Sequence, residues 1–351
     1  MRVKLSDITQ YSKGVQINGD ELVDNGDYIY LNGGINPSGR WTESNVGANT
    51  VTISEGGNSS GYINYITEPF WCGAHCYYLF NGPKNTKYLY YALKSQQDRL
   101  FAIRSGACMP NIKKSDLGKF EFEFDTNEQK QNEIVATLSR VETVIACRKR
   151  ELELLDDLIK ARFVEMFGEP QINPFHWDVV NISEVVGGEV SNGFFAKRDD
   201  YCDDGNVSVL GVANIVNRMY SKVDELPKTN ANNKDIEKFE VKYGDMLFCR
   251  SSLVAEGIGK ASIVPEDVQE NVLFECHVIR LPLNLNKCVP EFMQTLSTMD
   301  FFRNQVVAQS KTATMTTIGQ DGILKTDIIL PPIEKQKEFY DFVKQVDKSK
   351  F

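Results

Sequence analysis

Two cysteines and a histidine stand close enough in the sequence to share a metal ion. Cys72, His75 and Cys76 have the ligand chemistry that zinc prefers. A zinc site needs four protein ligands, or three and a water molecule, and no second ligand pair stands out. His277 takes the place of His75 in a later copy of the pattern, but only Cys276 stands beside it. We therefore expect both histidines to pack at strand ends, and we expect no metal.

Three short motifs resemble catalytic signatures, and each lacks an essential member. The Gly-Ile-Gly-Lys run at 257–260 ends like a phosphate loop, but Val254 stands where glycine is required and Ala261 where serine or threonine would bind magnesium. The Asn-Pro-Phe run at 173–175 resembles the Asn-Pro-Pro-aromatic turn of amino-methyltransferases but lacks its second proline. Residues 128–130 have the spacing of a nuclease motif, yet they open a helix and follow no suitable aspartate. We expect no catalytic residue and no cofactor.

Polar loops in the first part of the chain carry side chains of the kinds that can hydrogen-bond to base edges in the DNA major groove. Arginine, lysine, asparagine, glutamine, serine and threonine are the side chains suited to such bonds. The loops at 32–41 and 54–61 carry such groups among glycines and asparagines. Ordinary turns have the same composition, so that explanation stays open. The candidate binding residues here are Arg40, Trp41, Asn58, Ser59 and Ser60.

The second half of the chain repeats this arrangement. Arg250, Ser251 and Ser252 follow an expected strand at 246–249 and align with the loop at 54–61. A solvated surface is the ordinary explanation for each lysine of this half, and that explanation includes Lys311, which precedes the threonine-rich run at 312–317. The candidate binding residues in this half are Lys197, Arg198, Asn214, Arg250, Ser251, Ser252, Lys260 and Lys311.

A long helix separates the two polar regions. We predict it over 128–167, because no proline or glycine interrupts the sequence before Gly168. Its apolar residues recur in steps of four and three, with Arg148 and Arg162 filling two gaps in the series, which is typical of a coiled-coil seam. The seam consists of Ile134, Leu138, Val141, Ile145, Leu152, Leu155, Ile159 and Met166.

Segments before and after this helix match one another, which indicates an internal repeat. The predicted fold is α+β, with two mixed α/β domains related by a pseudo-two-fold axis and separated by long helices that form an antiparallel coiled coil. The domain ranges are 1–125, 126–168, 169–330 and 331–351. In the first domain we expect strands at 28–31, 50–53, 61–66 and 76–80 and a helix over 87–105. The matched segments are 5–8 with 182–185, 74–79 with 276–281, 109–112 with 315–318, and 130–131 with 335–336.

The second helix is the expected partner of the first, but only for its first half, roughly Ile134 to Ile145. The sequence stops at Phe351, before a second helix of equal length would end. That helix is either short by nature or truncated, and both alternatives stay open. In either case the remaining seam would bind another chain, by self-association or by docking a partner protein. The residues assigned to this partner binding are Leu152, Leu155, Ile159 and Met166.

Composition narrows the classes of protein. The formal net charge is −9, which argues against a protein that coats nucleic acid without specificity. No apolar run approaches the ~20 residues that span a membrane. Eight scattered cysteines and a polar first segment predict a cytoplasmic chain with reduced thiols.

Turn motifs ahead of each helix carry a family resemblance. Met-Pro-Asn-Ile at 109–112 and Met-Thr-Thr-Ile at 315–318 each precede a helix that opens with Glu-Gln-Lys-Gln or Ile-Glu-Lys-Gln, and Leu-Pro-Pro-Ile stands at 330–333. In this order they resemble the specificity subunit of Type I restriction-modification systems. The resemblance implies a non-catalytic subunit whose two target recognition domains read a bipartite double-stranded DNA site. On that basis the candidate binding residues of the polar loops are predicted to contact DNA. It also implies recruitment of modification (methyltransferase) subunits, two in number, and of restriction subunits.

Two alternatives remain open at this point. The acidic charge suits a coiled-coil scaffold whose globular heads bind proteins or glycans rather than DNA. A specificity module of a self-contained restriction-methylation enzyme is a third interpretation, although no catalytic segment is evident in the sequence.

Overall fold

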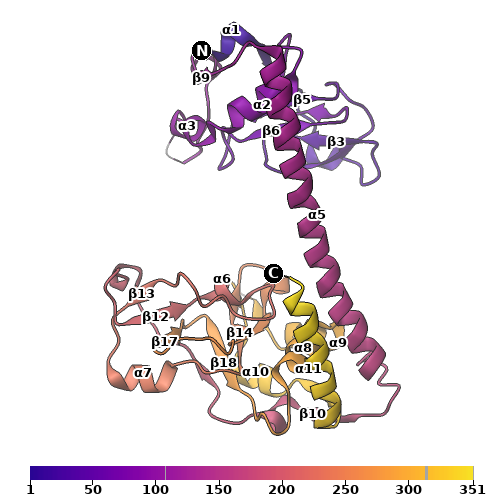
Figure 1. Cartoon of the computed structure of the whole chain (residues 1–351), viewed down its shortest axis with the longest axis vertical. Helices are drawn as coiled ribbons and strands as arrows, with labels where there is room; N and C mark the ends of the chain where they lie inside the picture. The colour runs from indigo at the N-terminus through magenta and orange to yellow at the C-terminus, as the bar shows by residue number, and fades with distance from the viewer. Residues whose placement is uncertain (107, 313–314, 351) are drawn as a thin grey trace. The chain divides into compact units, whose positions relative to one another are not determined.

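The computed structural model describes residues 1–106, 108–312 and 315–350. Contacts divide the chain into two compact units, unit 1 at Met1–Arg148 and unit 2 at Lys149–Phe351. The boundary falls inside helix α5 (Glu128–Phe167), so each unit includes part of that helix (Figure 1). Both units mix helices with sheets, as the sequence predicts.

Unit 1 is built on a four-stranded antiparallel sheet in the order β2-β8-β5-β6. Helix α2 packs on β5 and β6, and the apolar core lies between them. The four strands are Gln10–Lys13, Cys76–Phe80, Thr50–Ser54 and Ile63–Ile66. A second sheet, β4-β3-β7, joins Gly39–Trp41, Tyr28–Leu31 and Trp71–Cys72, and β1 (Arg2–Lys4) pairs with β9 (Glu121–Glu123). The helices are α1 (Leu5–Ile8), η1 (Gly19–Glu21), α2 (Thr86–Lys94), α3 (Gln97–Ala102) and α4 (Lys114–Gly118).

The four strands expected in unit 1 are confirmed, with small shifts at their ends. The single helix expected over 87–105 is wrong, because the chain breaks it into α2 and α3. The hydroxyl of Ser95 donates to the carbonyl of Ala92, and the N–H of Gln96 donates to Leu93 rather than to the carbonyl four residues back. Such local side-chain bonds compete with the helical pattern and end it.

The three sheets of unit 1 recur in unit 2, which has one further small sheet. Its four-stranded antiparallel sheet has the order β11-β18-β14-β16, from Ser191–Asn192, Val278–Pro282, Asp245–Cys249 and Ala261–Ile263. Its smaller sheet, β13-β12-β17, has one antiparallel and one parallel pairing, as β4-β3-β7 has. The pair β10 (Asp178–Asn181) and β21 (Asp327–Leu330) corresponds to β1 and β9. The predicted internal repeat is therefore confirmed in the backbone.

The other elements of unit 2 complete this second copy. The remaining strands are β12 (Val207–Leu210), β13 (Lys228–Thr229), β15 (Ser251–Ser252), β17 (Val272–Phe274), β19 (Lys311–Thr312) and β20 (Thr316–Thr317). The α-helices are α6 (Val212–Ile215), α7 (Asn233–Phe239), α8 (Pro290–Thr298), α9 (Asp300–Ala308), α10 (Gln320–Leu324) and α11 (Ile333–Lys348). The 3-10 helices are η2 (Ile182–Val185), η3 (Arg198–Asp200) and η4 (Ala255–Gly257).

The glutamine in each Lys-Gln pair has the same structural role at the start of its helix. Gln131 is buried and its Nε2 donates to the carbonyl of Asp125 at 2.6 Å. Gln336 is fully buried and its Nε2 donates to the carbonyl of Pro331 at 2.7 Å, while its Oε1 accepts from the N–H of Val289. Each glutamine thus ties its helix to the chain segment that leads into it.

Helix α11 pairs antiparallel with α5, but with a different part of α5 than the sequence suggested. Phe339 near the start of α11 contacts Phe163 and Phe167, with ring centroids 5.5 and 5.7 Å apart. At the other end, Lys350 forms an ion pair with Asp156 at 2.8 Å. The expected pairing with Ile134 to Ile145 is therefore wrong. The predicted seam, counted in steps of four and three from Ile134, does not include Phe163 and Phe167. These two side chains bury more apolar surface than any residue on that seam.

Residues 128–148 of α5 pack in unit 1 on one side only. Val135 contacts the core of that unit, and Tyr91 on α2 donates a hydrogen bond to Glu142 at 2.7 Å. The adjoining side keeps large apolar side chains in solvent. Ile134, Leu138, Val141 and Ile145 are exposed by 39%, 37%, 49% and 50%.

Candidate nucleic-acid interface

Glu55 and Arg250 occupy the same position in the two copies of the fold. The N–H of Glu55 donates to the carbonyl of His75 at 2.8 Å, and the N–H of Arg250 donates to that of His277 at 2.8 Å. The carbonyl of Glu55 accepts from the N–H of Ile112, as the carbonyl of Arg250 does from Ile318. A carboxylate in unit 1 thus stands where unit 2 has a guanidinium group. We name these two positions the paired loop positions.

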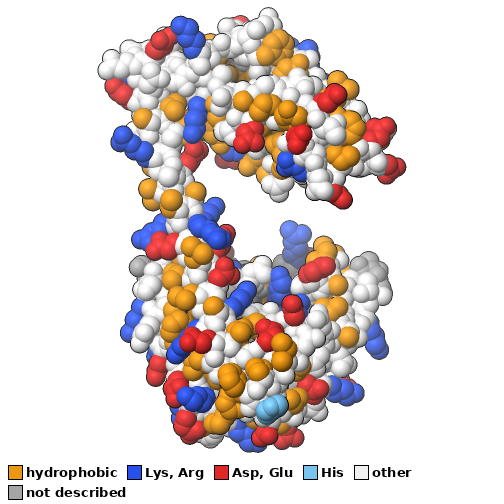
Figure 2. Space-filling model, turned by 90° about the vertical axis from the view of Figure 1, so that its right-hand side faces the viewer, with side chains coloured by type: hydrophobic (Ala, Val, Ile, Leu, Met, Phe, Trp, Pro, Cys, Tyr) orange, Lys and Arg blue, Asp and Glu red, His pale blue; other side chains and the backbone are white. Residues whose placement is uncertain are grey.

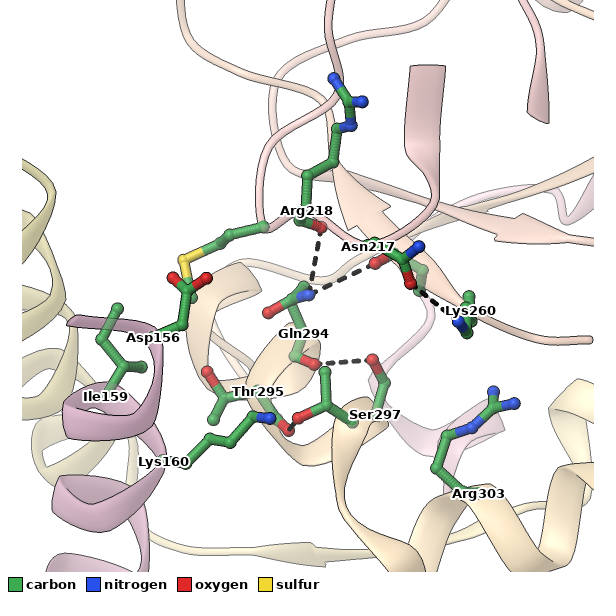
Figure 3. Close-up of a pocket in the computed structure, with 13 residues that line it drawn as sticks. Asp156, Ile159, Lys160, Asn217, Arg218, Lys260, Gln294, Thr295, Ser297 and Arg303 are labelled. Atoms are coloured by element: carbon green, nitrogen blue, oxygen red, sulfur yellow. Dashed lines mark hydrogen bonds between the residues drawn. The ribbon is translucent and has the colours of Figure 1, made fainter. Parts of the chain in front are cut away.

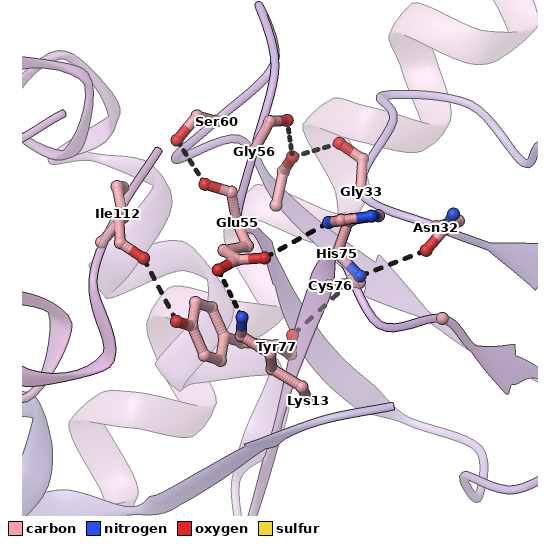
Figure 4. Close-up of polar contacts among 12 residues, drawn as sticks. Lys13, Asn32, Gly33, Glu55, Gly56, Ser60, His75, Cys76, Tyr77 and Ile112 are labelled. Carbon is pink, nitrogen blue, oxygen red and sulfur yellow. Dashed lines mark hydrogen bonds and ion pairs between the residues drawn. The ribbon is translucent and has the colours of Figure 1, made fainter. Parts of the chain in front are cut away.

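The carboxylate at the paired loop position of unit 1 lies between two basic side chains (Figure 4). Lys13 forms an ion pair with one oxygen of Glu55, and Nδ1 of His75 lies 3.4 Å from the other. The side chain of Glu55 is 17% exposed, whereas that of His75 is 61% exposed. Burial raises the pKa of the neighbouring Tyr77 to about 12, and the Glu55 charge adds to the rise. Glu55 is therefore held in place and still reaches the surface.

The arginine at the paired loop position of unit 2 adjoins a small polar sheet. Nη1 of Arg250 donates to the carbonyl of Cys276 at 3.1 Å, and Oγ of Ser251 lies 3.1 Å from Nδ1 of His277. The sheet has the order β15-β20-β19, and its register places Ser251 and Lys311 on either side of Thr317. The structure thus brings together four of the residues predicted from sequence, Arg250, Ser251, Ser252 and Lys311.

Lys260 lies apart from this group. Its Nζ donates to Oδ1 of Asn217 at 2.7 Å, and it lines a cavity whose lining contains none of those four residues. Lys197 and Arg198 are exposed at the start of η3. Oδ1 of Asn214 accepts from the N–H of Gly211 and closes the first turn of α6. Each of these residues therefore belongs to a different local structure of unit 2.

The residues predicted in unit 1 mostly hold their own loops together. The guanidinium of Arg40 donates to the carbonyls of Gly26 and Asp27, and the Trp41 ring packs edge-on against Trp71 at 6.3 Å. Oγ of Ser59 donates to the carbonyl of Gly33. Asn58 is exposed, whereas Ser60 is fully buried.

The buried position of Ser60 corrects one expectation. Its Oγ donates to the carbonyl of Glu55 at 2.7 Å, so it braces the paired loop position and is not available to a DNA groove in this conformation. Sequence reasoning missed Glu55 itself, because a carboxylate was not among the base-reading side chains considered. The matching of His75 with His277 in the repeat was the signal that could have located it.

The cysteine and histidine residues near position 75 form no metal site. Within 1–106, 108–312 and 315–350, no group of three or more histidine, cysteine, aspartate or glutamate side chains could hold a metal ion. Cys72 and Cys76 are buried, and the adjacent Cys76 thiol together with burial raises the pKa of Cys72. His75 points instead to Glu55.

Within residues 1–106, 108–312 and 315–350, every helix is too short or too polar to span a membrane.

The four residues assigned to partner binding differ sharply in exposure. Ile159 is only 3% exposed, since it packs in the unit 2 core that also contains residues of α8 and α11. Leu155 and Met166 are partly buried against the same core, and Leu152 is 41% exposed. The expectation that Ile159 lacks a partner within the chain is therefore wrong. Figure 2 shows hydrophobic side chains along the exposed part of α5.

Comparisons with known proteins fit this two-copy architecture. A family model described as the Type I restriction modification DNA specificity domain matches residues 1–156 and 174–351. The chain belongs to this family. Each matched specificity segment contains one of the two paired loop positions, and the family resemblance inferred from the turn motifs is confirmed.

Individual relatives agree with the family assignment. A Mycoplasma genitalium protein named as a type I specificity subunit is 30% identical over 213 residues, 57% of this chain and 54% of that protein. A Mycoplasma pneumoniae protein with a corresponding name is 30% identical over 236 residues, 63% of each chain. The chain thus spans between 54% and 63% of the length of these relatives. The crystal structure of a Type I restriction-modification S subunit from M. genitalium has the same fold, with a TM-score of 0.58 at 19% identity over 100% of this chain and 90% of that one.

Proposed function

We propose that this chain is the non-catalytic DNA-specificity subunit of a Type I restriction-modification complex. Each unit reads one half of a bipartite double-stranded DNA target, and α5 sets the distance between the halves. The observation that carries this proposal is the opposite charge at the paired loop positions. Both specificity segments present the same backbone loop, with a carboxylate at Glu55 and a guanidinium at Arg250.

This difference suits two readers of different sequences. A guanidinium donates two hydrogen bonds to O6 and N7 of guanine, whereas a carboxylate accepts from N4 of cytosine. Two heads with one scaffold and opposite groups at one position would therefore favour different half-sites. Ser251, Thr317 and Lys311 extend the polar surface beside Arg250, and Lys311 would contact a phosphate.

We assign partner docking to the exposed apolar side of α5. Ile134, Leu138, Val141 and Ile145 remain in solvent within unit 1, and Leu152 continues the same side within unit 2. Apolar side chains repeated along one helix are suited to a partner helix. The partners are modification subunits, which supply the methyltransferase activity, and the restriction subunits that assemble with them.

Sequencing of methylated positions tests the function. A host that carries the modification subunit is compared with and without this chain. The expected result is a new methylated motif of two short specified parts separated by unspecified bases. A methylation pattern that does not change when the chain is added would contradict the proposal, and would favour a scaffold whose heads bind other ligands.

A further inference from the structure

A cavity of about 340 Å³ in unit 2 gathers basic side chains from separate parts of the chain. It lies among α5, the segment 217–219, the start of β16, and helices α8 and α9 (Figure 3). Lys160, Arg218, Lys260 and Arg303 all line it. Arg218 directs its guanidinium away from the other lining groups, to the carbonyls of Val216 and Ala213, so Lys160, Lys260 and Arg303 are the remaining cations of the lining (Figure 3).

The positive charge of this cavity exceeds the negative charge, since Asp156 is the one carboxylate among the lining residues that the structure describes. Among the described residues, none of the four basic side chains of the lining lies within ion-pair distance of an aspartate or glutamate. The one acidic lining residue, Asp156, is paired with Lys350 at 2.8 Å. The bonds that the cations do make go to neutral oxygens, as from Lys260 to Asn217 at 2.7 Å and from Arg303 to the carbonyl of Glu256 at 3.0 Å. An anion would complete the electrostatics of the cavity.

Two buried polar atoms in the lining have no hydrogen-bond partner. Oγ1 of Thr295 is one, on a residue that is 2% exposed, and Nη1 of Arg303 is the other. Buried polar groups are normally satisfied, so an orphaned donor beside a cavity points to a missing acceptor. Burial also lowers the pKa of Arg303, because the charged guanidinium is partly desolvated. Gln294 is held in the cavity lining by its Nε2, which donates to the carbonyls of Arg218 and Ala261 at 3.3 Å.

We propose that this cavity binds a phosphate group. A phosphate presents several acceptor oxygens, which match a guanidinium fork, two ammonium groups and the hydroxyl of Thr295. Such oxygens come from two sources, the backbone of bound DNA or a free phosphate-bearing molecule. The site does not depend on the proposed reading function, because it is formed entirely by residues of unit 2 and includes none of the β15-β20-β19 sheet.

Thermal unfolding of the full chain with inorganic phosphate tests the site. Sodium phosphate replaces sodium chloride at constant ionic strength, so that general screening stays the same. A ligand that binds only the folded protein raises the melting temperature with its concentration. The wild type should show this rise, and the double variant Lys160→Gln/Lys260→Gln should lose most of it. Lys234→Gln, an exposed lysine on α7 outside the cavity, is the matched control and should keep it.

Thr295→Val separates a ligand contact from a merely structural role. The substitution preserves the shape of the side chain and removes the orphaned hydroxyl. It should raise the melting temperature without phosphate, because an unsatisfied buried group is gone. The same variant should bind phosphate about tenfold more weakly, since it loses a hydrogen bond to a charged ligand. A structural role alone would leave phosphate binding as in the wild type.

Competition with duplex DNA then distinguishes the two sources. If phosphate displaces the duplex at constant ionic strength, the cavity holds a backbone phosphate, and if both bind together it holds a free one. Phosphate stabilisation without any DNA binding would refute the proposed function and leave this site intact. An equal effect of phosphate and chloride, or an equal phosphate effect in all the variants, would overturn the site itself.

Discussion

Two isoleucines on the same helix give a matched test of the pairing between α5 and α11. Ile159 is 3% exposed in the unit 2 core, and Ile145 is 50% exposed. Truncating a buried isoleucine to alanine costs about 2–5 kcal/mol, and the higher helix propensity of alanine returns up to about 0.7 kcal/mol. We therefore expect Ile159→Ala to lower the free energy of unfolding by about 2–4 kcal/mol. Ile145→Ala should change it by less than about 0.5 kcal/mol.

Urea denaturation followed by tryptophan fluorescence measures this difference. Trp177 belongs to unit 2, and its Nε1 donates to the carbonyl of Phe167 at the end of α5. Replacing Trp41 and Trp71 with phenylalanine leaves Trp177 as the sole reporter. The measurement is repeated at several protein concentrations to exclude a contribution from association. Equal losses in the two variants, or a larger loss in Ile145→Ala, would refute the pairing described for α5 and α11.

Three further predictions concern a buried glutamine, a buried carboxyl group and the exposed side of α5. Gln336→Ala should destabilise unit 2 by about 2–4 kcal/mol in the same urea assay, because it leaves a buried backbone N–H unpaired; a loss below about 0.5 kcal/mol would contradict this. Burial raises the pKa of the Glu291 carboxyl above its ordinary value of 4.5. The protonated carboxyl therefore contributes stability that is fully present below pH 4.5 and is lost as the pH rises through the raised pKa. Glu291→Gln should therefore gain stability relative to wild type as pH rises, and a difference that is constant with pH would refute the assignment. Val141→Glu with Val144→Glu should preserve the melting temperature but weaken co-purification with the modification subunit, and unchanged co-purification would place the docking surface elsewhere.

Local sequence patterns predicted much of the backbone. The strands of unit 1 follow from β-branched and aromatic runs between glycine-rich loops, and the repeat followed from short matched segments. The same comparison aligned His75 with His277, whose carbonyls prove to anchor the paired loop positions. These features depend on neighbours in the sequence, or on a copy of them, so the sequence carries them directly.

The pairing of the helices depends on information that periodicity does not contain. The seam from Ile134 to Met166 identified a helix with an apolar side but not the surface that covers it. Phe292 on α8 stacks on Phe163 with centroids 5.3 Å apart, and this contact with a residue far along the chain fixes α5 in unit 2. No count along one helix could reveal it. The covered part of α5 was for this reason placed at the wrong end.

The candidate site also combines residues that local sequence predicted with residues that only the folded chain brings together. Arg250, Ser251 and Ser252 were predicted because they form one short run, whereas Lys311 joined them only through the β15-β20-β19 sheet. Lys260 was grouped with them by sequence and instead faces Asn217. Adjacent residues diverge and distant ones converge when strands pair, so loop composition alone could not define the site.

Methylation motifs of paired variants test the central claim most directly. The wild type, Glu55→Gln and Arg250→Ala are each expressed with the modification subunit, and methylated positions are sequenced. We expect a split motif for the wild type, with recognition relaxed in one half for Glu55→Gln and in the other half for Arg250→Ala. The loss at Arg250 should amount to about 1–3 kcal/mol of discrimination at one base. A contiguous motif, or two variants that alter the same half, would contradict an account in which the two units read separate half-sites.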